Sequence, residues 1–162
     1  PRVDETPRPG ESAERLCLRL ARAKAEAVAA SHPLARVIGS DQVAECDGQL
    51  LGKPGTPARA LTQLRLLSGR CARFHTGVAL IHNGECLHGV HTTTVWMRAL
   101  SDAELRRYIE AEPALDCAGS FKCEGYGISL FERIESDDPT GLEGLPLILT
   151  ARLLRQSGLA LP

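Results

Sequence analysis

Two short segments of the chain carry side chains that could act on a phosphate group. Asp41 stands at the predicted end of a buried strand that begins at Val37, and the turn Gly52-Lys53-Pro54 follows shortly after it. Because an open α/β sheet places its ligands at the carboxyl ends of the strands, a carboxylate there with a fixed lysine nearby suits a phosphate-bearing substrate and its metal. We therefore expect the chemistry at Asp41 and Lys53.

These residues also have ordinary structural interpretations. An aspartate at the end of a strand often only caps a turn, and lysines such as Lys24 and Lys53 often lie on the solvated surface. Lys24, however, falls four residues after Leu20, which places it along the inward side of the first predicted helix. That position favours a cleft residue.

Composition restricts the class of protein. A chain of 162 residues with 43% hydrophobic and 24% charged residues predicts one soluble domain, residues 1–162, with a substantial core. Nineteen basic and twenty acidic residues give a net charge of -1, so no polycationic signature for nucleic acid or an anionic membrane is present. The chain shows neither an apolar run of bilayer length nor a signal-peptide pattern, and we expect a cytoplasmic protein.

Cysteine and histidine spacing gives no metal or disulfide motif. The six cysteines form no C-x-x-C pair and scatter over the predicted elements, which is typical of small buried hydrophobic residues. His88 and His91 fall within a predicted strand, Cys86–Trp96, where their spacing places them on opposite faces. They cannot easily share one metal ion.

The predicted elements alternate as in an α/β fold. Ser12 caps a first helix with an inward stripe of Leu16, Leu20, Ala23 and Ala27, and Leu145-Pro146 starts a last helix with Leu147, Ala151 and Leu154 inward. Between them, Thr56 caps a helix that ends at Gly69, and the pair Ser101 and Glu104 forms a capping box. Arg73–Ile81 and Cys86–Met97 are predicted to form a hairpin around Asn83-Gly84, and a glycine-rich loop leads to a strand ending at Ile134.

Several short motifs together resemble one known family, the Maf nucleotide pyrophosphatases. No single motif is diagnostic, but their order and spacing along nearly the whole chain are specific. The motifs are Val3-Asp4-Glu5, Arg19-Leu20-Ala21-Arg22-Ala23-Lys24-Ala25, Ser40-Asp41-Gln42-Val43, Gly52-Lys53-Pro54, Leu67-Ser68-Gly69, Thr76-Gly77, Cys117-Ala118-Gly119-Ser120-Phe121-Lys122 and Gly144-Leu145-Pro146. Gln42 and the segment Lys122–Gly127 look like the branch that hydrolyses 7-methyl-GTP.

The resemblance implies a fold and an activity. The implied fold is α/β of the Maf and ITPase type, a mixed twisted sheet flanked by helices with a deep substrate cleft, usually in a homodimer. The implied reaction cleaves a modified nucleoside triphosphate between its α and β phosphates, which releases the monophosphate and pyrophosphate. The family uses a divalent cation, so we expect Mg2+ or Mn2+.

The resemblance also assigns roles by position. Asp41 corresponds to the proton acceptor, and the other polar residues at the phosphate end of the cleft correspond to Glu5, Lys24 and Lys53. Gln42 and Glu124 correspond to positions linked to base choice. Asp41 and Glu5 can each act as a base or as a metal ligand, and the sequence does not separate these roles. Glu124 suits 7-methylguanine because methylation leaves the ring positively charged, although a glutamate in a glycine-rich loop can also simply face solvent.

The chain departs from the family pattern at its start. Family members begin with a strand and a Ser-x-Ser-x-Arg-Arg loop, whereas this chain opens at Pro1-Arg2-Val3. We therefore expect a Maf-like domain that is incomplete at its N-terminus and lacks the first strand and helix. Three functions stay open: a pyrophosphatase for 7-methyl-GTP or a related modified nucleotide, a non-catalytic nucleotide-binding or cell-division-regulating protein, and a fragment without a site.

Overall fold

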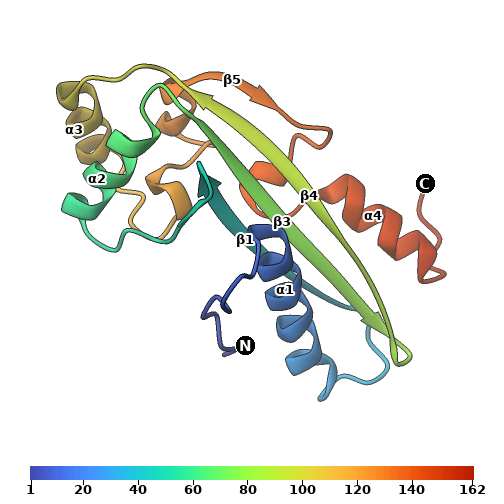
Figure 1. The fold of residues 1–162 in the computed structure, drawn as a ribbon. Helices are drawn as coiled ribbons and strands as arrows, with labels where there is room; N and C mark the ends of the chain where they lie inside the picture. The colour runs from blue at the N-terminus through green and yellow to red at the C-terminus, as the bar shows by residue number, and fades with distance from the viewer. The chain divides into compact units, whose positions relative to one another are not determined.

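The structure, a computed structural model that describes residues 1–162, contains four α-helices and a five-stranded sheet (Figure 1). The helices are α1 (Ala13–Ala29), α2 (Pro57–Leu67), α3 (Asp102–Ala111) and α4 (Leu147–Gln156). The strands are β1 (Val37–Cys46), β2 (Gln49–Leu51), β3 (Cys71–His82), β4 (Glu85–Met97) and β5 (Phe131–Glu135), in the order β2-β1-β3-β4-β5. The predicted α/β class is confirmed, with an antiparallel sheet where the sequence predicted a mixed one.

The residues group into two compact units, each with an apolar core. The first unit holds residues 1–42, 75–92 and 138–162, and the second holds residues 43–74 and 93–137. The core of the first unit includes Val78 and Leu80 of β3. In the second unit, the ring of Phe121 lies edge-on to Phe74 at 5.3 Å and to Phe131 at 4.8 Å. The single domain expected over residues 1–162 stays a prediction.

Three helices begin at the caps that the sequence predicted. The side chains of Ser12, Thr56 and Ser101 accept hydrogen bonds from the backbone at the starts of α1, α2 and α3. Glu104 completes the capping box of α3. The predicted hairpin is also confirmed, because β3 and β4 are joined by Asn83 and Gly84, both with positive φ.

Strand β1 runs past Asp41, whereas the sequence predicted that it would end there. The strand continues to Cys46 and turns at Asp47-Gly48, where both residues have positive φ. Its last residues then pair with β2, with Cys46 opposite Gln49. Pairing with β2 satisfies backbone groups that a strand ending at Asp41 would leave open. Asp41 is therefore a mid-strand residue rather than a strand-end residue.

The inward face of α4 is rotated from the predicted one. Leu147 is 52% exposed, and the buried leucines are Leu149 and Leu153, which pack against β3. The rotation is fixed at the start of the helix, where Ile148 N donates to a carboxylate oxygen of Asp138 at 2.7 Å. Gly89 of β4 leaves room for Leu149, since a Cβ at position 89 would lie 2.9 Å from its side chain.

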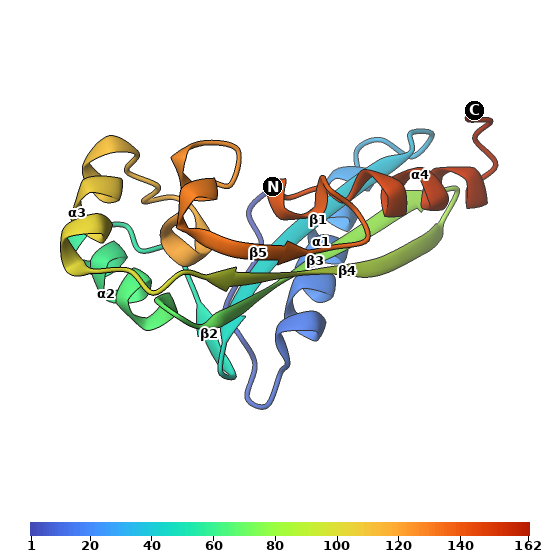
Figure 2. The same cartoon turned by 90° about the horizontal axis from the view of Figure 1, so that it is seen from above.

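Helix α1 lies with its backbone directly against the strands of the first unit. A Cβ at Gly39 would lie 2.2 Å from the carbonyl oxygen of Ala21, and one at Gly77 would lie 2.6 Å from that of Cys17. The buried face of α1 therefore includes Ala21 and Ala25, whereas the sequence predicted Ala23 and Ala27. Figure 2 shows α1 and α4 on opposite faces of these strands.

Candidate functional site

The close approach of α1 to β1 brings Lys24 to Asp41. Side chains alternate along a strand, so Gly39 and Asp41 share the face of β1 that α1 covers. Ala21 and Ala25 contact Gly39, and Lys24 lies next to Ala25 on the same helix. The ammonium of Lys24 donates to Oδ1 of Asp41 at 2.5 Å. The small residues at this contact thus set the distance between the two charged side chains.

Lys24 also pairs with Glu5, so one ammonium serves two carboxylates. Its Nζ lies 3.0 Å from Oε1 of Glu5. The side chains of Lys24 and Asp41 are 22% and 13% exposed, whereas that of Glu5 is 58% exposed. Burial by itself acts to lower the pKa of Lys24, but hydrogen bonds to Asp41 and Glu5 outweigh it and raise the pKa. Lys24 therefore stays charged at neutral pH.

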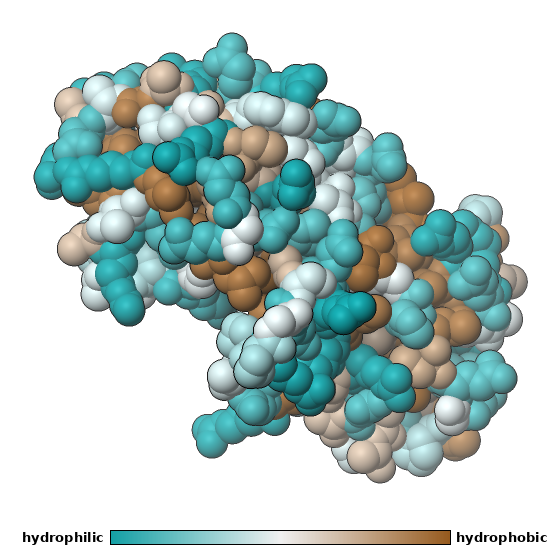
Figure 3. All heavy atoms as spheres, viewed as in Figure 1, coloured by the Kyte–Doolittle hydropathy of each residue, from teal (hydrophilic) through white to brown (hydrophobic).

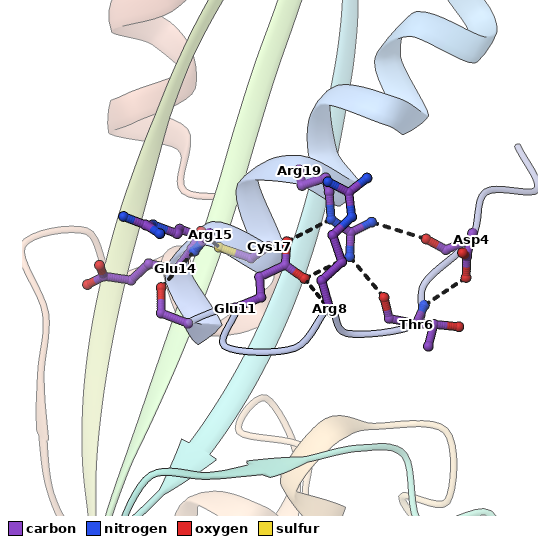
Figure 4. Close-up of polar contacts among 9 residues, drawn as sticks. Asp4, Thr6, Arg8, Glu11, Glu14, Arg15, Cys17 and Arg19 are labelled. Carbon is purple, nitrogen blue, oxygen red and sulfur yellow. Dashed lines mark hydrogen bonds and ion pairs between the residues drawn. The ribbon is translucent and has the colours of Figure 1, made fainter.

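Arg19 holds the N-terminal segment that carries Glu5. Its guanidinium makes two bonds to the carboxylate of Glu11, at 2.7 and 2.9 Å, and donates to the carbonyls of Asp4 and Thr6 at 3.3 and 3.0 Å (Figure 4). These two carbonyls flank Glu5 on either side. Because such a bidentate pair is geometrically specific, it fixes the backbone from which Glu5 reaches Lys24. Arg19 and Glu11 were not identified as site residues from the sequence.

Gln42 faces the opposite side of β1 from Asp41. Its amide nitrogen donates to Oγ1 of Thr76 at 3.0 Å and to the carbonyls of Gly141 and Leu142 at 3.0 and 3.4 Å. The carbonyls can only accept, which fixes the orientation of the amide and leaves its oxygen as the atom that can accept from a ligand. Gln42 thus braces the segment before α4 and does not join the ion pair of Lys24.

Lys53 belongs to the second unit and is exposed on an anchored turn. Gly52 O accepts from Gln63 at 2.8 Å, Gly55 N donates to Leu115 O at 2.9 Å, and Pro54 is fully buried. The backbone on both sides of Lys53 is therefore fixed, while its side chain projects into solvent. The charge of Lys53 is felt at Asp116, whose pKa is lowered by its own backbone N–H, by Lys122 and, to a smaller extent, by Lys53.

Glu124 also belongs to the second unit and is exposed. The thiol of Cys123 lies 3.4 Å from Oε2 of Glu124. The loop around it is closed by a bond from Gly125 N to Lys122 O at 3.3 Å. An exposed carboxylate on an ordered loop can contact a bound ligand, which agrees with the predicted role of Glu124 and does not test it.

The first unit therefore joins three of the predicted site residues, from three separate segments. Glu5 comes from the N-terminal segment, Lys24 from α1 and Asp41 from β1. The other predicted residues are Gln42, on the opposite face of β1, and Lys53 and Glu124, in the second unit. Hydrophilic side chains gather over α1 in Figure 3. Arg15, Arg22 and Glu26 of this helix are exposed.

The residues at the ion pair can hold a divalent cation together with a substrate, although they do not form a closed metal site. No group of three or more histidine, cysteine, aspartate or glutamate side chains gathers as ligands. Two carboxylates, those of Asp41 and Glu5, meet at one ammonium. Magnesium is commonly held by one or two carboxylates and the phosphates of a substrate, and the pair Asp41 and Glu5 fits that donor set.

A cavity of about 650 Å³ in the first unit is lined in part by Asp4 and Ala23, the chain neighbours of Glu5 and Lys24. Its lining comes from α1, the N-terminal segment and His88, and includes Arg8, Arg15 and Arg22 but not Lys24, Asp41 or Glu5. The cavity does not include the ion-paired side chains themselves, and the deep substrate cleft stays a prediction. None of the helices has the length and apolar character needed to cross a membrane.

Comparison with known proteins identifies one family and several relatives that share one name. The family model described as Maf-like protein matches residues 1–157. A 7-methyl-GTP pyrophosphatase of Xanthomonas oryzae pv. oryzae is 61% identical over 162 residues, which cover 100% of this chain and 85% of that protein. Proteins with the same name from Pseudomonas aeruginosa and Cupriavidus metallidurans are 51% and 52% identical, with coverage of 100% and 98% of this chain and 85% and 80% of theirs.

Proposed function

The chain belongs to the Maf-like protein family, and we propose that it is a nucleotide pyrophosphatase that hydrolyses 7-methyl-GTP, or a related modified nucleotide, to the monophosphate and pyrophosphate. The observation that carries the proposal is the contact of Lys24 with both Asp41 and Glu5, in the motifs that the family match covers. Nothing in the comparisons favours a non-catalytic protein.

Asp41 is proposed as the base. Water adds across the anhydride between the α and β phosphates, its proton passes to a carboxylate, and pyrophosphate leaves. The ammonium of Lys24 orients the carboxylate of Asp41 and offers positive charge to the polyanionic substrate. Glu5 is the more exposed of the two carboxylates, and we propose that it faces the substrate or a cation. Lys53 is proposed to offset phosphate charge from its anchored turn.

Gln42 and Glu124 are proposed to act on base choice. The methylated purine ring is cationic, so a carboxylate such as that of Glu124 gains Coulombic attraction that neutral guanine does not offer. The oxygen of the Gln42 amide can accept a hydrogen bond, since its nitrogen is used by Thr76 and two carbonyls. The geometry of Gln42 also supports a second way of acting, through the segment at Gly141 that it holds.

A divalent cation, Mg2+ or Mn2+, completes the proposed machinery, with Asp41 and Glu5 as the residues that would hold it. When bound, such a cation offsets phosphate charge and lowers the pKa of a coordinated water. Lys24 would orient the carboxylates of Asp41 and Glu5 toward such a cation. We further propose a cytoplasmic homodimer, on the basis of the family resemblance alone, and light scattering of the purified protein tests the oligomeric state.

The proposal is tested by identifying the products of 7-methyl-GTP hydrolysis with Mg2+ present. We expect 7-methyl-GMP and pyrophosphate as products. We also expect Asp41→Asn to lower turnover by about a thousandfold or more, while the variant still folds and shows a cooperative thermal unfolding transition. The matched control is Asp47→Asn, because Asp47 lies in an exposed turn with positive φ that asparagine tolerates. Release of orthophosphate with a diphosphate product would contradict the assignment, and full turnover in Asp41→Asn would remove that residue from the mechanism.

A further inference from the structure

The loop that carries Glu124 is attached at both ends to the last turn of α3. At one end, Lys122 N donates to the hydroxyl of Tyr108 at 3.0 Å. At the other end, Gly127 N donates to Oε2 of Glu112 at 3.2 Å. The same oxygen of Glu112 accepts from the Tyr108 hydroxyl at 3.2 Å, so the two anchors form one network.

The centre of the loop also rests on Glu112. A Cβ at Gly125 would lie 1.9 Å from Oε1 of Glu112, so any larger residue would have to displace this carboxylate. A Cβ at Gly127 would lie 2.2 Å from Lys122 O, which shows how tightly the loop closes on itself. One carboxylate therefore contacts the middle and one end of the loop, and through Tyr108 it reaches the other end.

Burial of Tyr108 stabilises this hydrogen-bond network. Tyr108 is only 5% exposed, and burial raises the pKa of its hydroxyl. The hydroxyl therefore stays protonated and donates to Glu112 while it accepts from Lys122 N. Glu112 is partly buried, whereas Glu124 is exposed. The network thus holds the backbone of the loop on its buried side, while the side chain of Glu124 stays exposed and accessible to a ligand.

We propose that Glu112, together with Tyr108, is a positioning residue for nucleotide selectivity, because it fixes the place from which Glu124 meets the purine base. The inference rests on the proposed function and adds to it a pair of residues that bind the backbone of the loop carrying Glu124. Glu112 acts through the backbone of residues 122–127, so its loss should mimic the loss of the Glu124 charge.

The test compares selectivity between 7-methyl-GTP and GTP, measured as the ratio of kcat/KM values. Glu112→Ala should lower the ratio by about fivefold, as much as Glu124→Gln does, with a much smaller change in turnover of GTP. Glu112→Gln should restore most of the ratio, because its amide oxygen can still accept from Gly127 N and Tyr108. Glu110→Ala is the matched control, since Glu110 is an exposed glutamate on the same helix.

A double variant separates positioning from general stability. If Glu112 acts through Glu124, Glu112→Ala combined with Glu124→Gln should show the same ratio as Glu124→Gln alone, because coupled residues are not additive. An additive loss, or an equal fall in turnover of both nucleotides, would overturn the positioning role. Tyr108→Phe provides a second variant should Glu112→Ala fail to fold, since the ring stays buried and only the hydroxyl is lost.

Hydrogen exchange of residues 123–126 keeps this test distinct from the proposed function. Glu112→Ala and Tyr108→Phe should speed exchange in this loop, whether or not any nucleotide is hydrolysed. A wild-type chain that hydrolyses no nucleotide would refute the proposed function, and with it the selectivity role. Unchanged exchange together with unchanged selectivity would refute the bracing itself.

Discussion

The two units of the chain hold their candidate site residues in opposite ways. In the first unit, Lys24 and Asp41 are largely buried and bind each other directly. In the second unit, Lys53 and Glu124 project into solvent, and the structure holds their backbones rather than their side chains. Removal of one partner from a largely buried ion pair destabilises the protein, because the other charge is left uncompensated. Exposed charges on fixed loops can be replaced with little effect on stability.

This difference suits the two tasks that the proposal assigns. A proton acceptor must have a defined orientation, and a partly buried ammonium at 2.5 Å holds the carboxylate of Asp41 in place. A side chain that distinguishes one base from another must meet a ligand, so Glu124 stays exposed and only its position is set. Substitutions in the first unit should therefore change stability as well as turnover, whereas those in the second unit should change function alone.

The largest effect on stability is expected at Gly39, where α1 meets β1. Gly39→Ala should lower the free energy of unfolding by about 3 kcal/mol, because the new Cβ would need α1 to move away from the strand. The same movement separates Lys24 from Asp41, so turnover should fall as well. Denaturant unfolding measures the first effect, and Gly52→Ala is the control because nothing lies within 4 Å of a Cβ there. Equal stability of the two variants would contradict the close packing.

Replacement of the two lysines should distinguish the units. Lys24→Met and Lys53→Met should each lower turnover of every nucleotide without changing the ranking of bases, by about a hundredfold and about tenfold respectively. Only Lys24→Met should also lower stability, by about 1 kcal/mol, since it leaves Asp41 and Glu5 without their shared cation. Steady-state kinetics with several nucleotides and thermal unfolding provide the readouts. Loss of activity toward a single base would place the lysine concerned near the base instead.

A smaller effect is expected for Glu124→Gln, and it should appear in selectivity alone. Because Glu124 is exposed, its attraction to a cationic purine is screened, and the preference for 7-methyl-GTP over GTP should fall by about fivefold, or about 1 kcal/mol. The stability of the protein should not change. Competition assays with both nucleotides measure the ratio. A parallel decline of both substrates would assign Glu124 to the phosphates or the fold.

The smallest effect is the pH dependence of the segment that carries Glu5. A hydrogen bond from Arg19 lowers the pKa of Glu11 from 4.5 to about 2. A lowered pKa in the folded state means that the stabilisation is present above pH 4.5 and is lost as the pH falls toward 2. Thermal unfolding between pH 7 and pH 3 should therefore show a shallower decline in Glu11→Gln and Arg19→Gln than in the parent chain. An unchanged dependence of the unfolding temperature on pH would show that the pair of Arg19 and Glu11 contributes nothing to stability.

Local sequence signals were sufficient for the starts of three helices and for one hairpin, whereas the choice of site residues stays a prediction. The side chains of Ser12, Thr56 and Ser101 cap their helices through local contacts, because each accepts a hydrogen bond from the backbone three residues ahead. Asn83-Gly84 likewise determines its hairpin through backbone φ alone. The order of the motifs along the chain indicated the family, which the match over residues 1–157 confirmed.

Contacts between distant segments were decided only by the tertiary structure. The choice of Ala21 and Ala25 over Ala23 and Ala27 depends on Gly39, and the rotation of α4 depends on Asp138, neither of which helical periodicity can include. The sequence likewise contains Arg19 and Glu112 without showing what they hold, because their partners are backbone groups brought near by folding. Residue types determined which chemistry is available to this chain, and packing determined which of those residues meet, since contact in space is a property of the whole fold.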